Sequence, residues 1–272
     1  MKSLSKKKTI GLRQKHEFVF FPKNFVVLES IKLLFAHPVL FLPKLLLAVL
    51  YGFGTLLSVD LAKELIRLYA VSFDQVAFSN ISSLLFGVIV LLFLTLVSFF
   101  LDLFFSGWYP VLVEHARKGR ISVLAAFSEV KPKLFAIFAS GLIVLALIFV
   151  VSVIEAGIIL TFNANDFGIL LSFVVSFVFI FLFYFLYPII VRKNLGLAGY
   201  FRENFSSTFS NKKKVFIYSF IPFSVSIIKF GVAFFADSAQ VMVLFWVLVL
   251  LTAFVYTIHS VASQLLYLKI SN

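Results

Sequence analysis

The first candidates for chemistry are the ionisable residues inside long apolar runs, because a charge near the bilayer centre costs about 2.5–3.5 kcal/mol and needs a reason to be there. Glu155 lies in the third such run and Lys229 in the fifth. Counted at 1.5 Å per residue, both lie roughly 10–12 Å below the same membrane surface. We expect an ion pair between them, which would either fix helix packing or belong to a substrate or proton pathway. The alternative is that the two side chains extend separately to the surface.

Asp102 and His259 are the other ionisable candidates inside the apolar runs. Asp102 lies near the basic end of the second run, where it could pair with Lys44 or simply face water. His259 lies near the hydroxyl groups of Thr257 and Ser260. A histidine in this setting could relay protons, but more often it forms a hydrogen bond with a neighbouring helix.

No other part of the sequence indicates catalysis. The chain has no His-Glu-x-x-His, Gly-x-Ser-x-Gly or phosphate-binding glycine-rich motif. It has four histidines and no cysteine, and its carboxylates are scattered singly. Neither a metal cluster nor a thiolate nucleophile is therefore indicated. We predict no catalytic residue, no metal and no cofactor.

The composition predicts a membrane protein. Of the 272 residues, 62% are hydrophobic and 13% are charged, whereas a soluble domain is about half apolar and about a quarter charged. The apolar residues form continuous runs of the roughly 20 residues that span about 30 Å of hydrocarbon. We predict an all-α polytopic protein with six transmembrane helices, at about residues 39–59, 81–105, 134–162, 169–191, 215–235 and 241–268.

The sequence predicts that these helices form three hairpins. The hairpins repeat one unit in the same orientation, as parallel repeats do. In each copy an interfacial amphipathic helix precedes the hairpin, and a tyrosine suited to the membrane interface marks its exit. The recurring positions are the anchors Phe35, Phe127 and Phe205, the exit residues Tyr109, Tyr187 and Tyr267, and the prolines Pro110 and Pro188. We predict one membrane domain over residues 24–272, with repeats at about 24–110, 120–190 and 197–268.

The net charge of +12 predicts the orientation. Lysine and arginine are concentrated in a flexible tail over residues 1–23 and in the connections 111–133 and 192–214. By the positive-inside rule, both termini should lie on the cytoplasmic side of the cell membrane. The expected partner of these residues is the anionic headgroup layer, at about 1 kcal/mol per basic residue, rather than nucleic acid. No protein partner is indicated.

One segment resembles a known family pattern. It runs Tyr109-Pro110-Val-Leu-Val-Glu114, continues to Gly119 and Ala126-Phe127-Ser128, and ends in Lys131-Pro132-Lys133. Over about residues 25–272 the chain resembles the membrane domain attached to some bacterial glycerophosphodiester phosphodiesterases, and related multi-pass proteins of bacteria and archaea. The second copy departs from the pattern, with Arg192 in place of the glutamate. Because the chemistry of those enzymes belongs to a separate soluble domain, the resemblance implies a fold and a topology but no activity.

Three functions are compatible with the sequence. A non-enzymatic protein that organises the membrane or scaffolds a partner complex is favoured by the basic amphipathic helices, and it predicts a tightly packed interior. A small-solute transporter or channel using Glu155, Lys229 and His259 predicts a wet cavity that reaches the buried charges. An intramembrane enzyme acting on lipid predicts clustered acid and base groups in a lipid-accessible groove.

Overall fold

The computed structural model describes residues 26–70, 78–119, 121–162, 165–233, 235 and 237–271, and all regular structure within these ranges is helical. Six helical segments in the described ranges are long and apolar enough to cross a membrane, which confirms the prediction of an all-α polytopic membrane protein. The elements are α1 (Val26–Ala36), η1 (Pro38–Phe41), α2 (Leu42–Ala70), α3 (Phe78–Arg117), α4 (Val123–Val130), η3 (Lys131–Lys133), α5 (Leu134–Phe162), α6 (Asn165–Leu182), α7 (Leu186–Arg192), α8 (Leu197–Ser210), α9 (Lys212–Ala233) and α10 (Ala239–Ser271).

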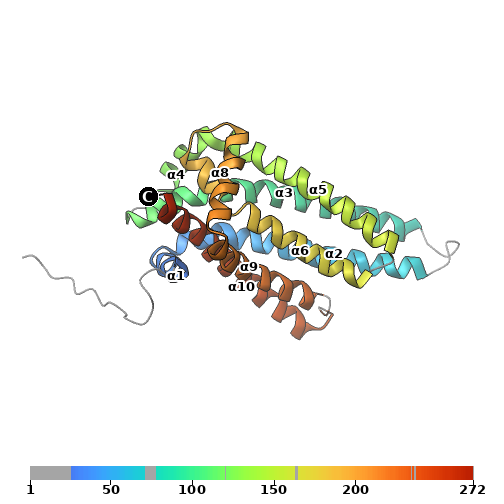
Figure 1. Cartoon of the computed structure of the whole chain (residues 1–272). Helices are drawn as coiled ribbons and strands as arrows, with labels where there is room; N and C mark the ends of the chain where they lie inside the picture. Colours follow the sequence, from blue (N-terminus) through green and yellow to red (C-terminus); the bar gives the residue numbers. More distant parts are fainter. Residues whose placement is uncertain are drawn as a thin grey trace, which may run out of the picture.

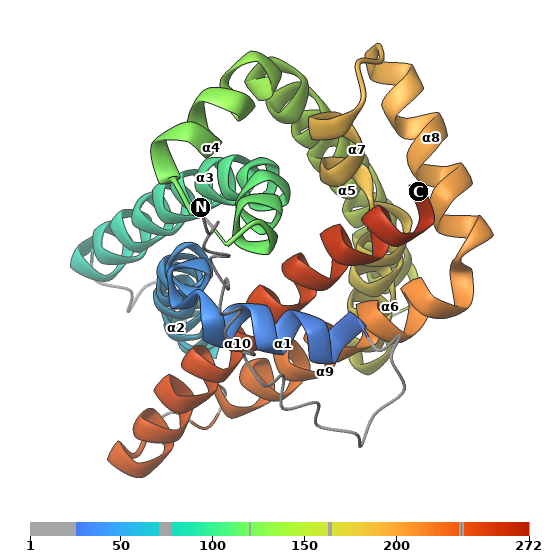
Figure 2. The same cartoon turned by 90° about the vertical axis from the view of Figure 1, so that its left-hand side faces the viewer.

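The long helices close into a ring in chain order. Each of α2, α3, α5, α6, α9 and α10 packs against the next, and α10 packs against α2. Figure 2 looks along the bundle and shows this arrangement, with the last part of α10 crossing the middle. The contact between α3 and α5 depends on two glycines, because a Cβ on Gly107 would collide with Ile137 and one on Gly141 with Leu103.

The short helices α1, α4 and α8 all lie at one end of the bundle, near the C-terminal end of α10 (Figure 1). This is the arrangement expected if each hairpin is entered from one membrane surface. The anchor Phe35 is 73% exposed and Phe127 is also exposed, whereas Phe205 packs against Phe183 with ring centroids 5.7 Å apart. The internal repetition itself stays a prediction.

The hydrophobic core is concentrated at the same end. It combines the second halves of α3 and α10 with α7, and its largest buried side chains include Tyr109, Phe185, Ile189 and Leu265. Towards the opposite end the helices diverge (Figure 1), and many apolar side chains are exposed, as Phe93 and Leu244 illustrate. Exposed apolar side chains at this depth suit contact with lipid. The bundle is therefore tightly packed at one end only.

The predicted end of the second span is wrong, and the fourth span is not one continuous helix. The second span does not end near residue 105, because α3 continues through Tyr109 and Pro110 to Arg117. Proline removes only one helical hydrogen bond, and neighbouring helices compensate for this readily inside a membrane protein. Tyr109 is consequently 1% exposed in the core, and Tyr267 is also buried within α10. The fourth span is interrupted at residues 183–185, between α6 and α7.

Candidate functional site: a polar cavity inside the helix ring

A cavity of about 530 Å³ lies inside the ring and is lined by α2, α3, α6, α7, α9 and α10. Its ionisable lining residues, tyrosines aside, are Lys44, Asp102, Lys229 and His259. Hydroxyl groups line the remaining polar wall, among them Thr55, Ser226 and Tyr256. Along α2 the lining runs from Lys44 to Thr55, which corresponds to about 16 Å at 1.5 Å per residue. Three of the four ionisable candidates from the sequence therefore share one cavity.

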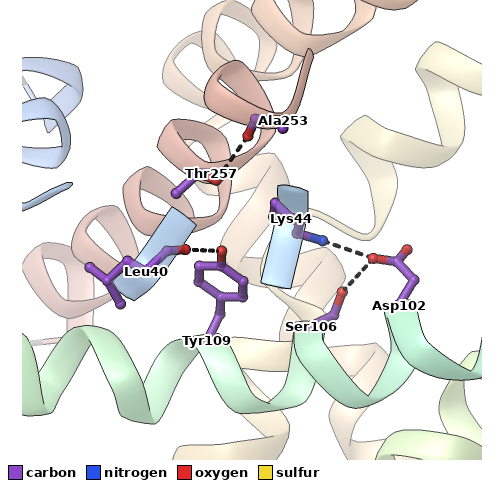
Figure 3. A network of polar contacts seen from close by, with 7 residues as sticks. All are labelled: Leu40, Lys44, Asp102, Ser106, Tyr109, Ala253 and Thr257. Carbon is purple, nitrogen blue, oxygen red and sulfur yellow. Dashed lines mark hydrogen bonds and ion pairs between the residues drawn. The ribbon is translucent and has the colours of Figure 1, made fainter. Parts of the chain in front are cut away.

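Lys44 and Asp102 form an ion pair across the cavity wall between α2 and α3. The Nζ–Oδ1 distance is 2.8 Å, and Lys44 is 7% exposed. Figure 3 shows the pair together with Ser106, whose Oγ donates to the same carboxylate oxygen at 3.5 Å. The Lys44 ammonium also lies 5.7 Å from the ring centroid of Tyr109, within the range of a cation–π contact. Both charges thus have a partner, as charges inside a membrane require.

Tyr109 holds the start of α2. Its hydroxyl donates to the carbonyl of Leu40, also visible in Figure 3. Pro43 lies three residues further along the chain and has no N–H to offer that carbonyl. Tyr109 thereby supplies a donor at the junction of η1 and α2, and it fixes α2 against α3 beside the ion pair.

His259 is held in the same way. Its Nδ1 lies 3.1 Å from the carbonyl oxygen of Tyr218 on α9, and a carbonyl only accepts, so Nδ1 carries the hydrogen. Pro222, four residues after Tyr218, cannot donate to that carbonyl. Of the two roles considered for His259, a hydrogen bond to a neighbouring helix is the one formed. In the neutral imidazole, Nε2 is then an acceptor.

The interruption between α6 and α7 forms part of the wall, and Asn204 of α8 stabilises it. The Asn204 amide donates to the carbonyl of Leu182 at 2.7 Å and accepts from the N–H of Phe185 at 3.1 Å. Pro188 cannot donate to the carbonyl of Tyr184, and the hydroxyl of Ser263 does so instead, at 2.8 Å. The sequence shows the proline, but it does not show that Asn204 and Ser263 reach this break.

The predicted Glu155–Lys229 pair is wrong, since the ion pairs formed within the described ranges do not include it. Glu155 is 7% exposed and accepts a hydrogen bond from Ser172 on α6. It does not line the cavity, whereas Lys229 does. The physical reason is the order of the ring, in which α6 packs between α5 and α9. Equal depth in the membrane did not make the two residues neighbours.

A cluster of polar contacts beneath the cavity joins three helices at the core end. Glu114 of α3 accepts from the amide of Gln264 at 2.9 Å and lies 3.4 Å from Nε of Arg192 on α7. Gln264 is fully buried in α10. These side chains, which the sequence did not identify as a group, lie about one helical turn beyond the lining residues Pro110, Pro188 and Ser260, towards the end that carries the short helices. The one available signal was that Arg192 takes the place of Glu114 in the second copy.

No metal site accompanies these contacts: no three histidine, aspartate or glutamate residues cluster within the described ranges. Comparison with protein-family models, with curated proteins and with solved structures gave no match. The resemblance to the membrane domain of the phosphodiesterases therefore stays an expectation.

Proposed function

We propose that this multi-pass membrane protein binds a small polar solute in the ring cavity and carries it across the membrane. The observation that supports this most directly is the cavity of about 530 Å³ that reaches Lys44, Asp102, Lys229 and His259. Small-molecule sites are commonly about 300–1,000 Å³ and combine apolar walls with a few polar groups. Ionisable side chains inside spans typically face such cavities and mark substrate pathways.

The competing functions predict different interiors. A purely organising protein predicts tight packing throughout the bundle, which the cavity interrupts. An enzyme predicts grouped acids and bases, yet Asp102 is the one carboxylate among the cavity-lining residues in the described part of the chain, and it is paired with Lys44. A role in organising the membrane surface stays compatible with the basic end of the molecule.

The packing is also consistent with alternating access. The core and the cluster of Glu114, Arg192 and Gln264 pack the helices tightly at one end, whereas the helices diverge at the other (Figure 1). Transport would require this packed end to loosen while the divergent ends come together, as when one bundle rocks against another around a central site.

Liposome flux tests the proposal. The purified protein is reconstituted, and uptake of lactate, phenyl phosphate, sorbitol and choline is compared with that of empty liposomes. We expect one of these charge classes to be taken up, and Thr55→Trp, which places an indole in the cavity, to abolish the uptake. Leu96→Trp is the matched control, because Leu96 is exposed on α3 and is not among the cavity-lining residues. Absence of protein-dependent flux for every solute, or equal flux in wild type and Thr55→Trp, would reject transport through this cavity.

A further inference from the structure

The two lysines of the cavity are not equivalent. Lys44 is neutralised by Asp102 at 2.8 Å. Lys229 of α9 is partly buried and lines the same cavity, but it takes part in none of the ion pairs among the described residues. With one carboxylate against two ammonium groups, the cavity has an uncompensated positive charge. A lone cation at this depth is costly unless it faces water or an anion.

The surroundings of Lys229 fit an anionic group. Ser226, one turn before Lys229 on the same face of α9, lies 2.8 Å from the hydroxyl oxygen of Tyr256 on α10. An ammonium has three donor hydrogens, and whichever of the two hydroxyls accepts in the Ser226–Tyr256 contact keeps its own hydrogen for a further donor. All three side chains line the cavity. A carboxylate or phosphate bound here would therefore receive charge-assisted hydrogen bonds, which are roughly twice as strong as neutral ones.

The rest of the cavity suits an organic body rather than a bare inorganic ion. The contact between Ser226 and Tyr256 sets the relative level of the antiparallel helices α9 and α10. Lys229 lies three residues beyond it in one direction and His259 three residues beyond it in the other, so the two are roughly 9 Å apart along the bundle. The apolar residues that line the cavity include Leu47, Phe179 and Phe183.

We propose that the solute is an organic anion whose carboxylate or phosphate group binds Lys229 and whose apolar body extends towards His259. This inference rests on the proposed function for its physiological meaning, but binding can be measured without transport. A lipid headgroup and a soluble organic acid share the relevant chemistry, and the experiment separates them.

The test is equilibrium binding to the full chain in nanodiscs of neutral lipid. The probes benzoate, phenyl phosphate, benzamide and benzylamine share one ring and differ in the charge of the polar group. We expect the two anions to bind and the neutral and cationic probes to bind at least about tenfold more weakly, because an unpaired buried charge recognises its counter-charge strongly. Lys229→Gln should weaken anion binding by about tenfold or more, and Lys229→Arg, which keeps the charge, should largely restore it.

Lys269→Gln is the matched control, because Lys269 pairs with Glu29 at 2.7 Å at the end of α10, outside the cavity. Equal binding of benzamide and benzoate, or unchanged anion binding in Lys229→Gln, would overturn the inference and indicate that Lys229 extends to the membrane surface. Repeating the assay with phosphatidylglycerol in the nanodiscs identifies the source: competition supports a lipid headgroup, and its absence supports a soluble anion. Anion binding without flux would reject transport but support the anion site. Flux of sorbitol or choline alone would support transport but reject the anion site.

Discussion

At the scale of single residues, three backbone carbonyls near prolines accept a hydrogen bond from a side chain of another helix. Pro188 and Pro222, four residues after Tyr184 and Tyr218, cannot donate to those carbonyls, and Pro43 cannot donate to the carbonyl of Leu40 in the i to i+3 pattern of the 3-10 turn η1. The donors are Tyr109, Ser263 and His259. Without water nearby, an unpaired carbonyl costs several kcal/mol, so these polar residues position helices around the cavity whatever else they do.

Ser263→Ala should therefore destabilise the protein. The substitution leaves the carbonyl of Tyr184 without the hydroxyl that bonds it at 2.8 Å. Interhelical hydrogen bonds in membrane proteins contribute about 0.6 kcal/mol on average and up to about 1.7 kcal/mol, and we expect a loss near the upper value because Pro188 offers no substitute. The free energy of unfolding can be measured by denaturant titration in micelles. Ser224→Ala is the control, since that hydroxyl bonds Phe220 within its own helix, and an equal loss there would contradict the explanation.

Glu155→Gln should leave solute flux close to that of the wild type. Glu155 lies outside the cavity lining and bonds Ser172, and glutamine keeps a side-chain oxygen that can accept from a hydroxyl. The liposome assay on Glu155→Gln and Lys229→Gln compares the two directly. A loss of flux in Glu155→Gln as large as that in Lys229→Gln would place Glu155 in the pathway. From the sequence these residues looked equivalent, because membrane depth was readable while the direction each helix faces was not.

At the scale of elements, the break between α6 and α7 shows what a helix prediction leaves out. The run 169–191 is apolar throughout and was predicted as one span, although Pro188 lies within it. The break is held by Asn204, which is 0% exposed on α8, a helix predicted to lie at the interface. Helix length and hydrophobicity are local properties that a sequence displays. The hydrogen bond from Asn204 to the carbonyl of Leu182 joins residues 22 positions apart, so it depends on how the helices pack and not on local sequence.

Asn204→Leu should destabilise the wall of the cavity strongly. It would remove the partners of the Leu182 carbonyl and the Phe185 N–H together, and each buried unpaired group costs about 1–3 kcal/mol. We expect a loss of about 2–4 kcal/mol in the free energy of unfolding. Asn204→Asp should fall between the wild type and Asn204→Leu, because it keeps the acceptor and loses the donor. Thermal melts of the three proteins measure the order, and an Asn204→Leu variant as stable as the wild type would mean that the break needs no side-chain support.

At the scale of the whole molecule, the sequence predicted the six apolar helices, and the structure adds the order in which they close. The ring places α6 between α5 and α9 and brings α10 back to α2, and this order brings together the helices that line the cavity. Neither the ring order nor the cavity follows from hydropathy, which carries no information on lateral neighbours. The end that carries α1, α4 and α8 also carries basic residues such as Lys131, Lys193 and Lys212, in line with the orientation predicted from the charges.

That orientation can be tested with single cysteines, because the chain has none of its own. Ser128 is exposed on α4, and Ser238 is exposed just before α10, at the far end of the bundle (Figure 1). If the basic end faces the cytoplasm, a membrane-impermeant maleimide should label Ser238→Cys in intact cells and Ser128→Cys only after the membrane is opened. The unsubstituted protein is the control and should stay unlabelled in both conditions. Labelling of Ser128→Cys in intact cells would contradict this orientation and would mean that the end with the short helices faces outwards.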